Sequence, residues 1–146
     1  KGGADFAERF DVGLPEASEI NKVLPGMVVS IDPDNTGALT VSDQAYDRKV
    51  AGIVSGGGGI APGMVMGQDG TIADGELPIA LSGRVYVYVD ESNGKIVPGD
   101  LLTTSNRPGY AMKVSNTKHA QGAIIGKAMS KIDPETGMVL VLVSLQ

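Results

Sequence analysis

The chain contains no cysteine and no tryptophan, and its other aromatic residues are few. Its 146 residues include four Tyr and two Phe. Without cysteine there can be no disulfide, no thiolate nucleophile and no cysteine-bound metal. A core with so few aromatics must be built from Val, Ile, Leu, Met and Ala, which suits thin β-layers better than thick helical bundles.

Clustered positive charge and long apolar runs are also missing. Twelve Lys and Arg are scattered among seventeen Asp and Glu, so the formal net charge is −5. Nonspecific nucleic-acid binding needs clustered cations that displace counterions, and we therefore expect no nucleic-acid partner. No run of eighteen apolar residues occurs, so we expect no membrane span. No signal peptide is visible, and the start at Lys1 suggests a processed piece or part of a longer chain.

What the chain does contain is an internal duplication. Leu24-Pro25-Gly26-Met27-Val28-Val29-Ser30 opens one half, and Val97-Pro98-Gly99-Asp100-Leu101-Leu102-Thr103 opens the other. Each Pro-Gly pair predicts a type II turn that starts a strand, because proline fixes φ at the second turn position and glycine accepts positive φ at the third. The residues shared by the copies build a scaffold and include no nucleophile, metal ligand or phosphate-binding loop.

The duplication predicts an all-β fold, a compact module that is either barrel-like or a sandwich. The sequence does not decide between these two arrangements, because both consist of short strands separated by frequent turns. We expect one domain over residues 1–146. Its parts are an N-terminal arm at 1–23, a first repeat with an insertion at 24–96, and a second repeat at 97–146, with the strands of the two pseudo-repeats at about 24–89 and 97–143. The alignment matches Val28 with Leu101, Ile53 with Ala128, and the closing strand 83–89 with 137–143.

One loop superficially matches the spacing of a calcium-binding loop. The matching residues are Asp32, Asp34, Thr36, Gly37 and Asp43. A proline at the second position and Asp in place of the final bidentate Glu favour a plain turn instead. The run Asp133-Pro134-Glu135-Thr136-Gly137 repeats the Asp-Pro-acid pattern without a twelfth-position acid. The turn interpretation therefore explains both loops, and we expect no metal site.

Two residues could carry catalysis. Ser55 precedes Gly56-Gly57-Gly58-Gly59, but no Lys-Ser/Thr of a nucleotide loop and no Gly-x-Ser-x-Gly elbow surrounds it. His119 is the only histidine and lies in a polar connection, which excludes a multi-histidine metal site. We expect no catalytic residue and no cofactor, and the sequence does not favour an enzyme.

Four aromatic residues are the candidates for assembly or contact. Phe6 and Phe10 lie four apart near the start of the chain, on one face of either a helix or a strand, and we expect them to dock this segment. Tyr86 and Tyr88 share one face of a strand. This pair either covers the less buried side of the sheet or forms a stripe that faces a sugar or a partner.

Three further stretches are distinctive: Gly3-Ala4-Asp5-Phe6-Ala7-Glu8-Arg9-Phe10, Ala51-Gly52-Ile53-Val54-Ser55-Gly56, and Pro98-Gly99-Asp100-Leu101-Leu102-Thr103-Thr104-Ser105. They resemble the β-rich C-terminal modules of phage tail fibres, neck appendages and related bacterial surface proteins. The module is similar to the peptidase G2 domain, an intramolecular chaperone with autoproteolytic activity. The resemblance implies a trimeric or otherwise self-associating appendage. No cleavage dyad matches residue by residue, and no long helix is visible.

These observations leave three hypotheses for function. The first is a structural self-assembly module of an extracellular fibre, phage tail appendage or filament, whose partners are copies of itself at a virion or cell surface. The second is an autoproteolytic intramolecular chaperone, a single-turnover peptidase acting on its own chain. The third is a carbohydrate-binding fibre tip that binds a surface glycan through Tyr86, Tyr88 and the acidic loops.

Overall fold

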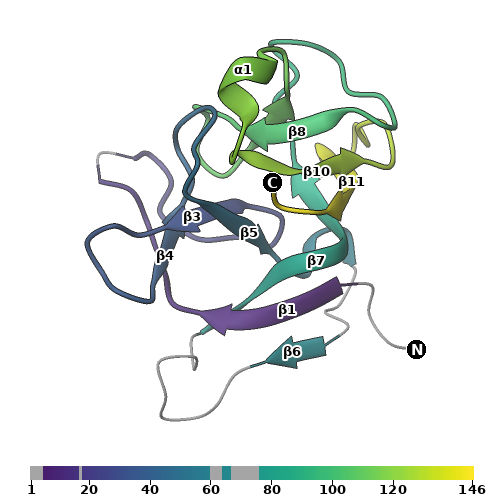
Figure 1. Cartoon of the computed structure of the whole chain (residues 1–146). Coiled ribbons are helices and arrows are strands. Elements are labelled where there is room, and N and C mark those ends of the chain that lie inside the picture. Colours follow the sequence, from purple (N-terminus) through teal and green to yellow (C-terminus); the bar gives the residue numbers. More distant parts are fainter. Residues whose placement is uncertain (1–4, 17, 60–63, 67–75) are drawn as a thin grey trace.

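The computed structural model describes residues 5–16, 18–59, 64–66 and 76–146, which are almost entirely β-structure (Figure 1). The all-β prediction is confirmed. Two short helical segments, η1 (Gly57–Gly59) and α1 (Thr117–Ala120), interrupt the strands. The strands are β1 (Asp5–Phe10), β2 (Val12–Gly13), β3 (Val28–Ile31), β4 (Leu39–Val41), β5 (Val50–Val54), β6 (Met64–Met66), β7 (Leu77–Tyr88), β8 (Leu101–Thr104), β9 (Ala111–Lys113), β10 (Ile124–Ala128) and β11 (Met138–Val143).

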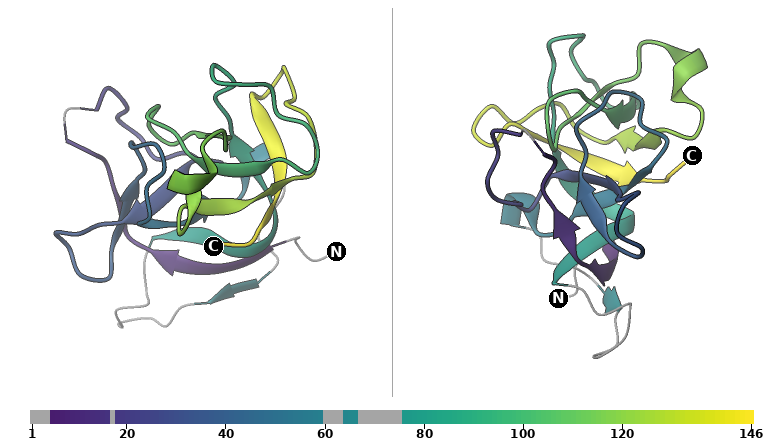
Figure 2. Two further views of the ribbon diagram at one scale, coloured as in Figure 1. Left: turned by 45° about the horizontal axis from the view of Figure 1, so that its top comes forward. Right: turned by 90° about the vertical axis from the view of Figure 1, so that its left-hand side faces the viewer.

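All of these strands belong to one sheet rather than to two stacked sheets. The hydrogen-bonded order is β2-β4-β3-β5-β7-β11-β10-β8-β9, and β1 pairs with both β6 and β7. The twelve-residue strand β7 lies at the centre of this order. Its first part pairs with β1 and β5, and its second part pairs with β11. Figure 1 shows β7 between β1 and β5, and Figure 2 shows the teal strand beside the purple β1 from two further directions.

The two halves repeat the same strand pairing. In the first half β3 pairs with β4 and β5, and β5 pairs with β7; in the second, β8 pairs with β9 and β10, and β10 pairs with β11. Val29 lies opposite Gly52 as Leu102 lies opposite Gly126, and a register shift follows at the same place in both pairs. Ile53 lies opposite Val28 as Lys127 lies opposite Leu101. Lys127 is therefore the counterpart of Ile53, whereas the sequence alignment matched Ile53 with Ala128, one position later.

The Pro-Gly turns are equivalent in detail. Gly26 and Gly99 both have φ of +97°. The NH of Gly26 donates to the Val54 carbonyl at 2.8 Å, and the NH of Gly99 donates to the Ala128 carbonyl at 2.8 Å. In each turn the NH of the fourth residue donates to the carbonyl of the first. Met27 donates to Leu24 at 3.2 Å in the first copy, and Asp100 donates to Val97 at 3.1 Å in the second. The predicted turn geometry is therefore present twice.

The beginning of the chain is a strand of the first copy rather than a separate arm. Strand β1 lies antiparallel to the first part of β7, with Phe10 opposite Leu77. In the same way, the second part of β7 lies antiparallel to β11, with Val87 opposite Val139. Strand β7 therefore closes the first copy and opens the second. The expected match of 83–89 with 137–143 is wrong, because Ala80 lies opposite Ile53 as Leu142 lies opposite Lys127, which makes Ala80 the counterpart of Leu142.

Parallel contacts complete each copy. Val12 in β2 pairs in parallel with Leu39 in β4, and Val89, just after β7, forms a parallel bridge with Ala111 in β9. In each half the opening strand thus contacts the last strand of the β3-β4 or β8-β9 pair, and all of these strands remain in one sheet. By this register the copies divide within β7, near residue 83, earlier than the Pro-Gly turns indicate.

The buried apolar residues form two clusters. The smaller consists of Met27, Val29, Leu39, Val41, Val54 and Ile79, all from the first copy. The larger fills the second copy and continues into the first through Val28, Val50, Ile53 and Ala80. Because the consecutive residues Val28 and Val29 face different clusters, the first part of strand β3 is buried on both sides.

Candidate functional site

The four predicted contact residues occupy different environments. Phe6 has 37% of its surface exposed, whereas Phe10 packs against the smaller core cluster. A register shift between Phe6 and Ala7 breaks the simple alternation along β1. The two phenylalanines therefore do not act as one docking face: Phe10 anchors the strand, and Phe6 remains at the surface.

The two tyrosines are half-buried by different neighbours. Tyr86 lies under η1, where a Cβ added at Gly58 would be only 2.7 Å from the Tyr86 ring. Tyr88 packs on the smaller core cluster, and its ring centroid lies 5.3 Å from that of Tyr110. The Arg107 guanidinium covers the Tyr110 ring at 3.8 Å. These contacts cover part of each tyrosine ring and leave both tyrosines half-exposed.

Further exposed side chains, both apolar and basic, lie on the side of β7, β11 and β10 that carries Phe6 of β1. Leu142 is 46% exposed and lies opposite Arg84 in β7 and Lys127 in β10, and both basic residues are exposed. Leu140, two residues earlier, shares its face. Met129, 44% exposed, donates its backbone NH to the Leu140 carbonyl at 2.7 Å. We call this set, Phe6, Arg84, Lys127, Met129, Leu140 and Leu142, the outer sheet face.

Sequence reasoning missed most of the outer sheet face. The run Met138-Val139-Leu140-Val141-Leu142-Val143 is apolar at every position, so it predicts a strand buried on both sides. Met138 and the odd-numbered residues Val139, Val141 and Val143 are buried, whereas Leu140 is half-buried and Leu142 is exposed. Arg84 and Lys127, which lie opposite Leu142 on the two neighbouring strands, indicate which side of β11 is exposed. Sequence alone does not reveal this pairing, because it depends on the register of the strands.

Ser55 and His119, the two catalytic candidates, have separate partners. The Ser55 hydroxyl donates to the Asp5 carboxylate, and both residues are buried. This bond ties the end of β5 to β1. The His119 ring instead contacts the Tyr46 ring edge-on at 5.9 Å between centroids, and its Nδ1 lies 3.2 Å from the Asn116 side-chain amide. The structure does not bring the serine and the imidazole together.

The two Asp-Pro loops form the same kind of turn. The Asp32 carboxylate accepts hydrogen bonds from the Asp34 NH and the Asn35 side chain, both at 2.9 Å. These bonds, the one from Asn35 first, hold the pKa of Asp32 below its ordinary value. Asp133 accepts from the Glu135 NH at 2.9 Å in the same way. Within the described residues, no three acidic or histidine side chains converge as a metal site would require.

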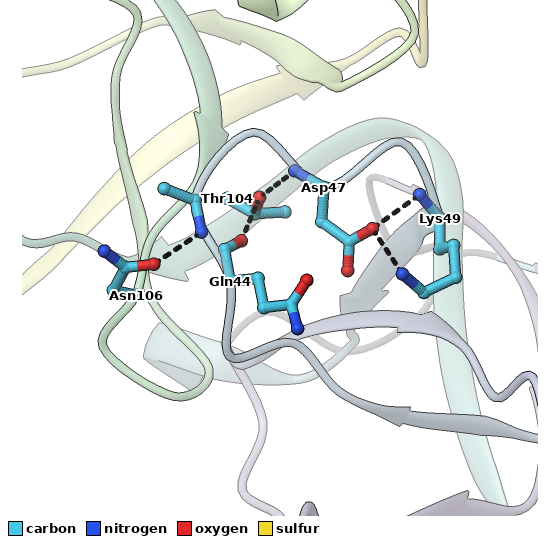
Figure 3. Close-up of polar contacts among 6 residues, drawn as sticks. Gln44, Asp47, Lys49, Thr104 and Asn106 are labelled. Atoms are coloured by element: carbon cyan, nitrogen blue, oxygen red, sulfur yellow. Dashed lines mark hydrogen bonds and ion pairs between the residues drawn. The ribbon is translucent and has the colours of Figure 1, made fainter.

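A polar network joins the two copies. It connects the loop between β4 and β5 in the first copy to the end of β8 in the second (Figure 3). The buried Thr104 hydroxyl donates to the Gln44 carbonyl at 2.6 Å and accepts from the Asp47 NH at 2.8 Å. The Asn106 side-chain oxygen accepts from the Ala45 NH at 2.8 Å. Because these bonds fix consecutive backbone groups, the 44–47 loop is held rigidly against the second copy.

Comparisons with protein-family models, with curated proteins and with solved structures found no match. In the described part of the chain, no helix has the length and apolar character needed to cross a membrane.

Proposed function

We propose that the chain is a structural self-assembly module whose outer sheet face binds a second copy of the chain. The exposure of Leu142 in β11, Phe6 in β1 and Met129 just after β10 is the observation that carries the proposal. Large exposed apolar groups gathered on one face and bordered by charged side chains are typical of interaction sites. A rigid sheet presents such a face with little loss of backbone entropy on binding.

Charge favours a copy of the same chain as the partner. Arg84 and Lys127 flank Leu142, whereas the chain as a whole has a net charge of −5. A groove lined in part by Glu16, Asp32, Asp34 and Asp43 provides an acidic counterpart, and the exposed Leu14 adds an apolar contact there. Opposite charges on two different surfaces favour their association.

A contact between two different surfaces is heterologous, and it generates rings when the rotation closes and open filaments when it does not. Both outcomes agree with the trimeric or otherwise self-associating appendage that the sequence resemblance implies. We accordingly place the module in an extracellular fibre, a phage tail appendage or a related filament at a virion or cell surface. No chemical step is part of this proposal.

Static light scattering over a concentration series tests the proposal with two matched variants. Leu142→Ser removes an exposed side chain from the outer sheet face, and Val97→Ser removes one that is 44% exposed at the second Pro-Gly turn. We expect the unmodified chain and Val97→Ser to exceed the 15.0 kDa monomer mass as concentration rises, and Leu142→Ser to stay near it.

A second variant, Arg84→Glu, reverses one charge of the face without changing the core and should also reduce the mass. Raising the salt concentration should weaken the assembly of the unmodified chain, because exposed charge pairs are screened. Circular dichroism shows whether each variant is folded. A monomeric unmodified chain at every concentration, or equal behaviour of Leu142→Ser and Val97→Ser, would overturn the proposal.

A further inference from the structure

A second surface feature, distinct from the outer sheet face, lies where the two copies meet. It is an open cavity of about 790 Å³ between the 45–48 loop of the first copy and the α1 region of the second. Its lining consists of Ala45, Tyr46, Arg48, Lys118, His119, Gln121 and Gly122. The cavity therefore exists only because the copies are docked against each other.

The lining carries positive charge without any acidic residue. Among the described residues the ion pairs join Lys49 to Asp47 and Lys113 to Asp100, so neither Arg48 nor Lys118 has a carboxylate partner. Asp47, the acid nearest in sequence, is buried and accepts two bonds from Lys49, at 2.9 Å from the NH and 3.0 Å from Nζ. In a chain of net charge −5, this cavity is a local concentration of cations.

The walls of the cavity are held in place before any ligand binds. Tyr46 has a φ of 55°, a conformation that bulky residues rarely adopt. The network of Figure 3 fixes the backbone on both sides of Tyr46 through Thr104 and Asn106. The Tyr46 hydroxyl also accepts from the NH groups of Ser115 and Asn116, at 3.1 and 3.0 Å. Such strain persists where the surrounding structure enforces it, and it is frequent at binding sites.

We propose that this cavity binds a small oxyanion, a carboxylate or phosphate group, through Arg48 and Lys118. The planar guanidinium of Arg48 can donate two parallel hydrogen bonds to such a group, and the Lys118 ammonium adds a point charge. The Gln121 side-chain amide and the His119 ring supply further hydrogen-bonding groups. The site is independent of the outer sheet face, so either proposal can fail without the other.

Two-dimensional NMR of the ¹⁵N-labelled chain tests the proposal, with inorganic phosphate and glucuronate as separate probes. We expect at least one probe to shift the amide signals of Tyr46, Arg48 and Gln121 in a saturable manner. Tighter binding of phosphate would identify a phosphoryl group as the ligand chemistry, and tighter binding of glucuronate would identify a sugar acid.

Substitutions locate the binding. Arg48→Gln and Lys118→Gln should each weaken it by about tenfold, the size expected for loss of a charge-assisted hydrogen bond. Lys131→Gln changes the net charge equally at an exposed position outside the cavity and should leave the affinity unchanged. Two results would overturn the proposal: neither probe gives saturable shifts at these amides, or Lys131→Gln weakens binding as much as Lys118→Gln does.

Discussion

Two buried hydroxyl groups at equivalent positions of the two copies differ in their hydrogen bonding. Ser30 and Thr103 occupy the same place in β3 and β8, and both are buried. The Thr103 hydroxyl donates to the Ala123 carbonyl at 2.6 Å. The Ser30 hydroxyl has no hydrogen-bond partner among the described residues. A buried hydroxyl without a partner costs free energy, whereas one with a partner contributes about 1 kcal/mol.

This difference predicts opposite effects of removing the two hydroxyls. Ser30→Ala should leave the free energy of unfolding unchanged or increase it. Thr103→Val should decrease it by about 1 kcal/mol, because the Ala123 carbonyl loses its donor. Urea denaturation of both variants measures the two changes. A loss of stability in Ser30→Ala comparable to that in Thr103→Val would show that the Ser30 hydroxyl has a partner after all.

Tyr46 offers a second prediction at this scale. Burial alone would raise the pKa of Tyr46, but hydrogen bonds from the Ser115 side chain and from the NH groups of Ser115 and Asn116 stabilise the phenolate and lower the pKa overall. The folded chain therefore releases this proton at lower pH than the unfolded chain. The resulting stabilisation is absent below the folded pKa and complete above the unfolded pKa.

Ultraviolet absorbance during an alkaline titration measures this effect when the Tyr46→Phe titration is subtracted. We expect the difference curve to have its midpoint below the ordinary tyrosine pKa. Ser115→Ala should move the midpoint upward, because it removes one of the stabilising hydrogen bonds. A difference curve at or above the ordinary pKa would contradict the bonding described for the Tyr46 hydroxyl.

Among the elements, the two Pro-Gly turns share one backbone conformation but differ in their surroundings. A Cβ added at Gly26 would lie 2.8 Å from Met138 Cε and 3.2 Å from the Tyr88 ring. At Gly99, no atom lies within 4 Å of the added Cβ. Both glycines have the same positive φ, so an alanine is strained in both turns but clashes only in the first.

We therefore predict that Gly99→Ala lowers the free energy of unfolding by about 1 to 2 kcal/mol, the cost of the left-handed conformation for an L-residue. Gly26→Ala should lower it further, because Met138 and Tyr88 must also move. Thermal denaturation of the two variants compares these losses directly. Equal losses would mean that Met138 and Tyr88 yield without cost.

The sequence predicted elements whose signals are local and missed those that depend on pairing. Both Pro-Gly turns and their strands are found, because proline and glycine specify turn geometry by themselves. The role of β7 was not predictable, since one strand closes the first copy and opens the second. The insertion predicted within the first repeat can be compared with the structure only in part, because residues 60–63 and 67–75 lie outside the described residues. The sequence did not predict the cavity, because Arg48 and Lys118 line the same cavity only when the two copies are docked.

For the whole molecule, the duplication explains both the core and the surface. Docking of the two copies buries Val28 and Ile53 in the larger cluster and leaves the outer side of β7, β11 and β10 uncovered. A single chain therefore keeps Leu142, Met129 and Phe6 in contact with water. Covering these side chains with a second copy would gain the free energy of burying apolar surface, about 25 cal/mol per Å².

Hydroxyl-radical footprinting at low and high protein concentration tests this coverage most directly, because it reports the solvent exposure of individual side chains. We expect oxidation of Met129, Phe6 and Leu142 to fall as concentration rises, while Val97, an exposed residue of the second Pro-Gly turn that is not part of the outer sheet face, stays equally reactive. Unchanged oxidation of all four residues across the concentration range would contradict self-assembly through this face.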